Sequence, residues 1–178
     1  MLKMNSMNKI VKYLENTYEI KETKYPIDMQ FHITVENNQV HSILSDLKSK
    51  GFTQLSLITC VDWIDENEFQ LTFILFNWDN GIHAVINTRL DRDNPKFTTI
   101  LPIFPGAEYY ERDVHEFFGV EFEGNEKSFK ELFLELWDEL PPMRKDFDPQ
   151  AFSDKTFPKM EYTTQFLTDV GGIDHEGS

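Results

Sequence analysis

The sequence predicts an α+β fold, in which helices pack on a mixed or antiparallel sheet with a β-meander, plus an extended C-terminal arm. Helical and strand-like spacings of apolar residues alternate over residues 7–51. Three strand-like segments then follow one another, and consecutive strands joined by short turns must be antiparallel. Clear periodicity is lost after residue 149. We therefore expect a domain over residues 1–149 and an extended, partner-docking tail over residues 150–178.

Two helices and a strand are predicted before residue 52. The first helix begins near Ser6, a residue type that caps helix N-termini, and the second ends near Gly51, where a glycine commonly closes a helix. Between them, residues 27–35 alternate apolar and polar side chains, which indicates a strand with one buried face. The apolar positions of the two helices are Met7, Ile10, Val11 and Leu14, and Val40, Ile43, Leu44 and Leu47.

The β-meander is predicted from alternating apolar residues and from turn sequences between them. Asn80-Gly81 favours the positive φ angles of a type I′ hairpin turn. Apolar residues lie on both sides of the strands, so we expect a sheet that is partly covered on both faces. The charged segment 91–96 is expected to be a loop. The predicted strands span residues 55–63, 69–75 and 82–86, and the residues expected to share one face of the first are Leu55, Leu57, Thr59, Val61 and Trp63.

The composition is that of a globular protein with an acidic surface. The chain has 178 residues and a net charge of −14, which disfavours contact with nucleic-acid phosphates and with anionic membrane surfaces. Its single cysteine, Cys60, cannot form an internal disulfide or hold an iron–sulfur cluster, and its place in a β segment favours a packing role. No apolar run approaches the ~20 residues of a membrane span, and the first residues do not resemble a signal peptide. We expect a cytoplasmic chain.

A third helix is predicted between Pro105, which favours a helix start, and Gly119, which favours a helix end. Its polar residues lie one turn apart in pairs, which is typical of a solvated face with weak ion pairs. His115 lacks a second histidine one turn away, so the zinc-protease motif is absent. The polar pairs are Glu108–Arg112 and Glu111–His115, and the apolar stripe comprises Ala107, Tyr110, Val114, Phe117 and Phe118.

The segment after this helix has helical spacing again over residues 129–137. The proline pair at 141–142 stops any helix, and a charged extended run follows it. Arg144 is suited to a bidentate carboxylate contact, so we expect it to reach back to the acidic helix face or outward to a partner. The charged run contains Arg144, Lys145, Asp146 and Asp148.

Two sequence blocks together closely resemble the C subunit of respiratory complex I, the 30-kilodalton-subunit family. The first block, residues 104–124, contains Pro-Gly-Ala, then Glu-Arg-Asp, then Phe-Gly-x-x-Phe-x-Gly; the second, residues 142–147, reads Pro-Met-Arg-Lys-Asp-Phe. The resemblance covers about residues 7–150. Family members in complex I have His-Pro where this chain has Asn125-Glu126. In this respect the chain is more similar to the version in membrane-bound nickel–iron hydrogenase-like and ferredoxin-dependent complexes.

The resemblance implies a non-catalytic subunit in the hydrophilic arm of a complex I-like membrane-bound oxidoreductase, such as a membrane-bound hydrogenase or a related ferredoxin-oxidising, ion-translocating complex. It implies no catalytic, cofactor-binding or metal-binding residues in this chain; iron–sulfur clusters, with nickel–iron as a further candidate, would belong to partner subunits. The implied partners are a large hydrogenase-like subunit of the complex I D type, a small iron–sulfur subunit and membrane subunits, with the chain peripheral on the cytoplasmic face of the cell membrane. The positions carried over as structural or interface residues are Glu111, Arg112, Asp113, Glu116, Phe118, Gly119, Gly124, Arg144, Lys145 and Asp146.

Alternative functions remain open on the sequence. The chain could be the C-type component of an NADH- or deazaflavin-dependent quinone oxidoreductase, or a stand-alone acidic adaptor. An acidic enzyme that uses Glu108, Glu111 and Glu116 as acid–base groups would have no nucleophile, metal motif or phosphate loop to work with. The electron donor and acceptor are not encoded in this chain, because those sites would lie on other subunits.

Overall fold

The computed structural model describes residues 2–157, and the chain divides into two compact units, residues 1–147 and 148–178. The elements of the first unit are, in order, α1 (Leu2–Thr17), β1 (Ile20–Lys24), β2 (Gln30–Val35), the 3-10 helix η1 (Asn37–Gln39), α2 (Val40–Ser49), β3 (Gln54–Trp63), the 3-10 helix η2 (Ile64–Glu66), β4 (Glu68–Asn77), β5 (Ile82–Asp91), β6 (Lys96–Thr98), α3 (Ala107–Phe118) and β7 (Glu121–Glu123).

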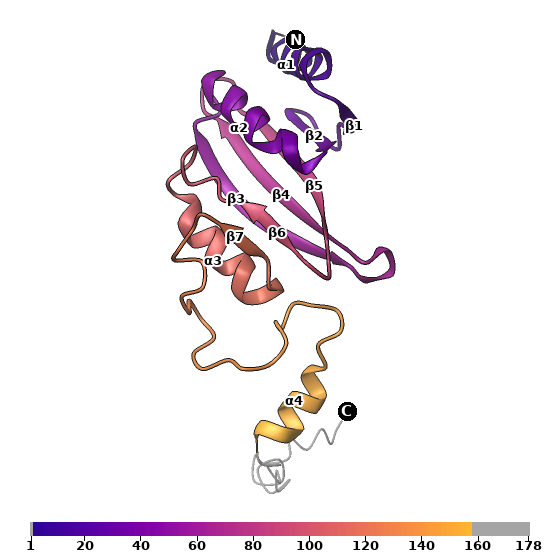
Figure 1. The fold of residues 1–178 in the computed structure, drawn as a ribbon. Coiled ribbons are helices and arrows are strands. Elements are labelled where there is room, and N and C mark those ends of the chain that lie inside the picture. The colour runs from indigo at the N-terminus through magenta and orange to yellow at the C-terminus, as the bar shows by residue number, and fades with distance from the viewer. Residues whose placement is uncertain (1, 158–178) are drawn as a thin grey trace, which may run out of the picture. The chain divides into compact units, whose positions relative to one another are not determined.

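Five strands form a mixed sheet in the order β1-β2-β5-β4-β3 (Figure 1). Strands β3, β4 and β5 are the predicted antiparallel meander. The predicted type I′ turn is wrong, because Gly81 takes φ 73° but Asn80 has no positive φ, and four residues connect Asn77 to Ile82. β2 runs parallel to β5, which requires the crossover that α2 and the meander supply. The mixed α+β fold is thus confirmed. β1 was not predicted. The parallel pair β6–β7 was not predicted either, because each of these strands is too short to show a period.

The core lies on one face of this sheet, where α2 crosses it (Figure 1). In β4 the side chains at alternate positions are fully buried, whereas Gln70, Ile74 and Phe76 are only half-buried on the opposite face. The buried residues of β4 are Phe69, Leu71, Phe73 and Leu75, and helices α1, α2 and α3 add Met7, Val11, Leu14, Val40, Ile43, Leu44, Leu47, Ala107, Val114 and Phe118.

The residues expected to share one face of β3 do not do so, because Leu55 packs against the core whereas Leu57 is exposed. Ile58, Cys60 and Asp62 are buried, whereas Val61 and Trp63 are each 40% exposed. A register shift between Leu55 and Leu57 changes the phase of the alternation within the strand, so positions that look equivalent in sequence fall on different faces. The expected packing role of Cys60 agrees with its burial, which raises the pKa of its thiol to about 12.

The helix ends show which capping signals operate. Gly51 and Gly119 take φ 93° and 82°, the left-handed values that close α2 and α3 as predicted. The Ser6 N-cap is wrong, because α1 already begins at Leu2 and Ser6 lies inside it. No helix within residues 2–157 is long and apolar enough to cross a membrane.

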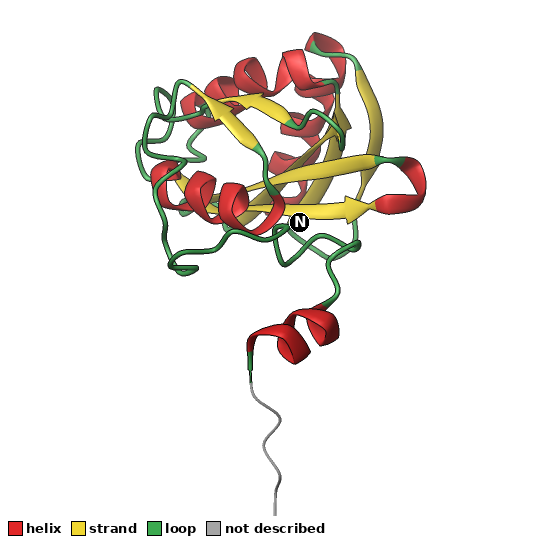
Figure 2. Cartoon of the chain, turned by 60° about the horizontal axis from the view of Figure 1, so that its bottom comes forward, coloured by secondary structure: helices red, strands yellow, loops and turns green. Residues whose placement is uncertain are grey.

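The helix predicted over residues 129–137 does not form. The connection from Gly124 to Phe147 consists of turns and bends without a helix or strand (Figure 2). Backbone amides of residues 132–134 bond to the Glu116 carboxylate instead of to carbonyl groups of a helix.

In the second unit, α4 (Pro149–Thr156) replaces the first part of the expected extended tail. The Asp148 carboxylate accepts hydrogen bonds from the amides of Gln150 and Ala151, both at 3.0 Å, and Pro149 stands at the first helical position. The remainder of the predicted arm, residues 158–178, lies outside the described residues.

Candidate functional site

A fully buried carboxylate, Glu111, joins the first sequence block to its surroundings. Its Oε2 accepts hydrogen bonds from Thr99 Oγ1 at 2.7 Å and from Asn125 Nδ2 at 2.8 Å. Its Oε1 accepts from the amide of Ile100 at 2.8 Å. Thr99 follows β6 and Asn125 follows β7, so one side chain of α3 ties both strand ends to the helix. The expectation of a solvated position is therefore wrong for Glu111, which is 0% exposed.

The backbone next to Glu111 depends on a glycine. Gly124 takes φ 92°, and a Cβ added there would lie 3.0 Å from Thr99 Cγ2. A larger residue at this position would be strained and would also press on a donor to Glu111. Asn125, which departs from the His-Pro of complex I members, provides another of these donors and is 3% exposed.

The predicted ion pairs along α3 do not form. Glu108 pairs with Lys127 at 2.9 Å instead of with Arg112. His115 Nδ1 lies 2.8 Å from the carbonyl oxygen of Val120, which can only accept, so this nitrogen donates the hydrogen bond. The loops that follow α3 fold back over its polar face. Their backbone carbonyl groups bond to Arg112 and His115, and Lys127 pairs with Glu108, in place of the predicted pairs within the helix.

A second buried cluster is centred on Arg92, directly after β5. Its Nε and one terminal nitrogen donate to the two carboxylate oxygens of Asp62 at 2.7 and 3.0 Å, and that nitrogen also donates to Asp146 Oδ1 at 2.7 Å. The amide of Lys145 donates to Asp62 at 2.7 Å. The side chains of Arg92 and Asp62 are 7% and 0% exposed. The second sequence block is thereby attached to β3 and to the end of β5.

Arg144 completes this cluster without reaching the acidic face of α3. Its Nε lies 3.3 Å from Asp146 Oδ1. The guanidinium carbons of Arg144 and Arg92 lie 5.4 and 5.6 Å from the centre of the Phe69 ring. Phe69 also contacts Phe118 edge to face at 6.1 Å, so both sequence blocks meet at this aromatic ring.

The cluster keeps its carboxylates ionised. Burial raises the pKa of Asp62, but hydrogen bonds from Arg92 and from the Lys145 amide outweigh burial, and the net pKa falls below its usual 3.8. Burial likewise raises the pKa of Asp146, and hydrogen bonds from Arg92 and Arg144 bring it below the usual value. The hydrogen bonds with Asp62 are the main reason that the pKa of Arg92 is raised.

Two further residues of α3 hold the segment between the blocks. The Glu116 carboxylate accepts hydrogen bonds from the amides of Leu132, Phe133 and Leu134 at 2.7, 3.0 and 3.1 Å. Arg112 donates to the carbonyl oxygens of residues 130 and 131 at 3.2 and 2.6 Å. Arg112 and Glu116 thus bond to loop carbonyl and amide groups. A helix over this segment would have used those backbone groups in its own hydrogen bonds.

The segment held in this way, residues 129–143, is called the apolar loop, and five of its apolar side chains are exposed to solvent. Phe117 of α3 contacts Phe133 at a ring distance of 6.2 Å, and His115 contacts Phe129 at 4.7 Å. Even so, much of the loop's apolar surface is uncovered. The exposed fractions are 60% for Phe129, 67% for Phe133, 88% for Leu136, 38% for Leu140 and 56% for Met143.

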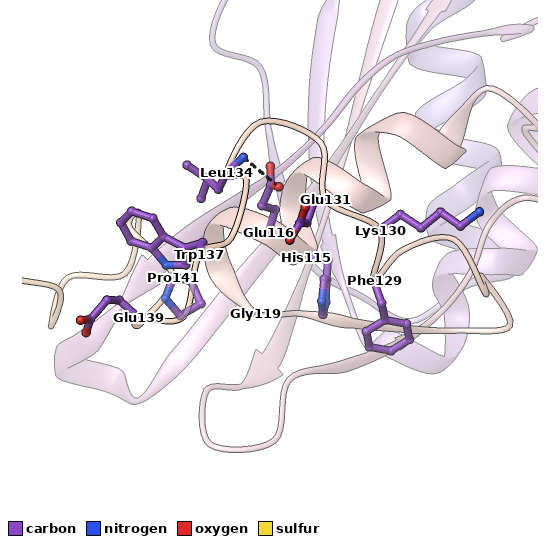
Figure 3. A pocket seen from close by; sticks show the side chains of 10 residues that line it. All are labelled: His115, Glu116, Gly119, Phe129, Lys130, Glu131, Leu134, Trp137, Glu139 and Pro141. Atoms are coloured by element: carbon purple, nitrogen blue, oxygen red, sulfur yellow. Dashed lines mark hydrogen bonds between the residues drawn. The ribbon is translucent and has the colours of Figure 1, made fainter.

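A pocket of about 280 Å³ lies between α3 and the apolar loop (Figure 3). Trp137 and Pro141 lie toward one end of it, and Phe129 and Lys130 lie toward the other (Figure 3). The dashed contact in the figure joins Glu116 to the amide of Leu134. The pocket has aromatic walls and polar groups, but no group of three or more metal-ligating side chains occurs in the described part of the chain.

Comparison with known proteins shows which family contains this fold and the two sequence blocks. Residues 33–153 match the protein family described as the respiratory-chain NADH dehydrogenase 30 Kd subunit. The chain belongs to this family. The match includes both buried clusters and the apolar loop.

Individual relatives are components of respiratory complexes. The chain is 29% identical over 161 residues to the C/D 2 subunit of NADH-quinone oxidoreductase from Aquifex aeolicus, which covers 89% of this chain but only 26% of that protein. It is 25% identical to the C subunit of F(420)H(2) dehydrogenase from Methanosarcina mazei, over 72% of this chain and 82% of that one. A chain of the archaeal membrane-bound sulfane sulfur reductase superposes with a TM-score of 0.77 and 36% identity, over 88% of this chain and 97% of that one.

The predicted residues of this 30 Kd-family member fall into two groups. Those with internal contacts hold the blocks and the loop: Glu111, Arg112, Glu116, Phe118, Gly119, Gly124, Arg144 and Asp146. Lys145 contributes its amide, whereas its side chain is exposed. Asp113 is half-buried, and its side chain has no hydrogen bond or ion pair within residues 2–157. Burial, and to a smaller extent the negative charge of Glu116, raises the pKa of Asp113.

Sequence reasoning missed four residues of the buried clusters: Asp62, Arg92, Thr99 and Asn125. The one available signal was the position of Asp62, which is in phase with Ile58 and Cys60 on β3. A carboxylate in phase with buried apolar residues requires a buried cation or several hydrogen-bond donors, but nothing in the sequence identifies Arg92 as its partner, since Arg92 lies thirty positions away in the chain.

We expect Glu111→Ala to destabilise the protein by about 3 kcal/mol or more, because three donors, two of them in buried side chains, lose their acceptor. Glu108→Ala is the matched control on the same helix, and loss of its partly exposed pair with Lys127 should cost at most about 1 kcal/mol. Chemical denaturation of both variants measures the difference. Equal losses would show that the Glu111 bonds are not structurally important.

The Arg92 cluster predicts a pH dependence with a definite sign. Because the folded pKa values of Asp62 and Asp146 lie below 3.8, their stabilising contribution is present above that pH and is lost as the pH falls through the folded values. In Arg92→Leu, burial of Asp62 is no longer offset, so its pKa should rise.

The loss of unfolding free energy in Arg92→Leu should therefore be large at pH 7 and shrink towards pH 3. Arg89→Leu, a half-exposed arginine on the open sheet face, is the control, and its smaller loss should change less with pH. Urea denaturation at a series of pH values measures both. A loss in Arg92→Leu that stays constant with pH would contradict the assigned charge pairing.

Proposed function

We propose that this chain is a non-catalytic, cofactor-free hydrophilic-arm subunit of a complex I-like membrane-bound oxidoreductase, and that its apolar loop docks on the large hydrogenase-like subunit. The observation that carries this proposal is the apolar loop itself. It exposes five large apolar side chains within fifteen residues, while Glu116 and Arg112 fix its backbone. Exposed large apolar side chains gathered in one segment favour a protein-interaction site.

The way the loop is held suits a docking role. A loop that is already ordered loses less conformational entropy when it binds, so more of the contact energy appears as affinity. Its two phenylalanines and Leu136 are large enough to fill pockets on a partner. The two buried clusters fix both ends of the segment, and α3 supports its middle.

The three acidic residues considered as acid–base groups have structural engagements instead. Glu111 and Glu116 each accept several hydrogen bonds, and Glu108 pairs with Lys127. These contacts favour a supporting role over proton transfer. Under this proposal, the iron–sulfur clusters, and nickel–iron where present, belong to the partner subunits.

The similarity to the sulfane sulfur reductase chain supports membership of a membrane-bound respiratory complex. Assignment to the hydrogenase-like branch and to the cytoplasmic face is part of the proposal. The F(420)H(2) dehydrogenase and NADH-quinone oxidoreductase relatives support the alternative, the C-type component of a deazaflavin- or NADH-dependent quinone oxidoreductase. A large subunit encoded nearby with four nickel-binding cysteines would indicate a hydrogenase. One without them would indicate a quinone- or sulfur-linked complex.

The second unit is proposed as an additional docking arm. α4 is followed by Phe157, which is 61% exposed, and residues 158–168 add further aromatic residues in sequence. Short amphipathic segments that order on a partner surface are a common mode of recognition.

We expect Phe133→Ala/Leu136→Ala to reduce incorporation of the chain into its complex by tenfold or more, because each change removes exposed apolar contact area. The folded chain should lose little stability, since these side chains are 67% and 88% exposed. Affinity purification of the tagged full-length chain from its native host, with quantification of co-purifying subunits, measures incorporation.

The matched control for this experiment is Tyr25→Ala/Ile27→Ala. These side chains are also one aromatic and one aliphatic residue, 52% and 63% exposed, in the turn between β1 and β2. Full incorporation of the loop variant, or an equal loss in the control, would refute docking through the apolar loop. Purification without any large subunit would favour the stand-alone adaptor.

A further inference from the structure

Acidic residues are frequent in and beside the apolar loop. Residues 126–139 contain five acidic residues and two lysines. One of these lysines, Lys127, is already paired with Glu108 of α3 at 2.9 Å. Acidic residues therefore outnumber basic ones along the segment that carries the exposed apolar side chains.

Three of these acids are available to a partner. Glu126, Glu135 and Asp138 are exposed, and none of them has a hydrogen bond or ion pair among the described residues. Glu135 immediately precedes Leu136, the most exposed apolar residue of the loop, and Asp138 is two residues beyond it. By contrast, Glu116 and Glu131 are engaged, because both accept hydrogen bonds from loop amides.

The face of α3 that supports the loop extends the acidic border. Asp113 lies one turn before Glu116, is half-buried and has no partner within the described part of the chain. Its carboxylate is close enough to Glu116 for the two to repel one another. Glu19, Asp28 and Asp65 are exposed acids whose side chains also lack partners among the described residues, but they lie at three separate places in the chain, away from the apolar loop.

We infer that the partner surface that receives the apolar loop is a protein surface with an apolar depression bordered by lysine or arginine side chains, which face Glu126, Glu135 and Asp138. This inference rests on the proposed docking role of the loop and adds the chemistry of its partner. Complementary charges around an apolar contact mainly raise the association rate and exclude wrong partners. An anionic lipid surface does not fit, because the same carboxylates would be repelled by it.

Competition in cells tests this inference with the complete complex. An untagged wild-type chain and a variant chain are co-expressed in the native host, and mass spectrometry of the purified membrane complex gives their incorporation ratio. The reversed variant is Glu126→Lys/Glu135→Lys/Asp138→Lys, and the neutral variant is Glu126→Gln/Glu135→Gln/Asp138→Asn. The control, Glu19→Lys/Asp28→Lys/Asp65→Lys, makes the same change in net charge as the reversed variant, but on other elements.

Incorporation should follow the charge of the border. We expect about a threefold loss for the neutral variant, tenfold or more for the reversed variant, and less than twofold for the control. Thermal denaturation of the isolated chains should show similar stability for all three, because the altered side chains are exposed and without internal partners among the described residues.

The outcomes separate this inference from the docking proposal. If the neutral and reversed variants compete as well as the wild type while Phe133→Ala/Leu136→Ala fails, the loop docks but its partner has no basic border, and the inference is overturned. Equal losses in the reversed variant and the control would also overturn it, because net charge would then be the cause. If the apolar variant competes normally as well, the docking proposal itself fails.

Discussion

The arrangement of α3, β6 and β7 depends on the hydrogen bonds that the buried Glu111 side chain accepts. A charged group without access to water is tolerated only when donors surround it, and here Thr99, Ile100 and Asn125 supply them from two separate loops. The same bonds that satisfy the carboxylate fix the ends of β6 and β7 against α3. Loss of Glu111 would leave all three donors without this acceptor, so a single side chain holds both loops.

The Arg92 cluster acts in the same way at the ends of β3 and β5. Its bidentate contact with Asp62 neutralises a cation in the core, and one of the same two nitrogens also donates to Asp146, more than fifty positions later in the chain. Buried pairs of this kind add little net stability compared with apolar packing, but they define one geometry, since any other leaves a charge unpaired. The two clusters therefore set where the connection between the blocks begins and ends.

Between these fixed points the chain forms no regular structure, yet its backbone is held by α3. Glu116 and Arg112 bond to amides and carbonyls that a helix would have used internally. The apolar side chains that a helix would have turned toward the core are left on the surface. The proposed docking function follows from this replacement of helical hydrogen bonds. It leaves apolar side chains without internal packing, and these are available to another subunit.

The sequence by itself determined the α+β class, the meander, helices α2 and α3 with their glycine ends, and membership of the 30 Kd subunit family. Each depends on local periodicity, on turn and cap chemistry, or on motif spacing, all of which are written along the chain. Only the tertiary structure decided which face of β3 is buried, that Glu111 is a core residue, and that residues 129–137 form a loop. The reason is physical: a bulge shifts the phase of a strand, and a carboxylate can replace helical hydrogen bonds only when folding brings it to the amides. Both depend on contacts between residues that are distant in sequence.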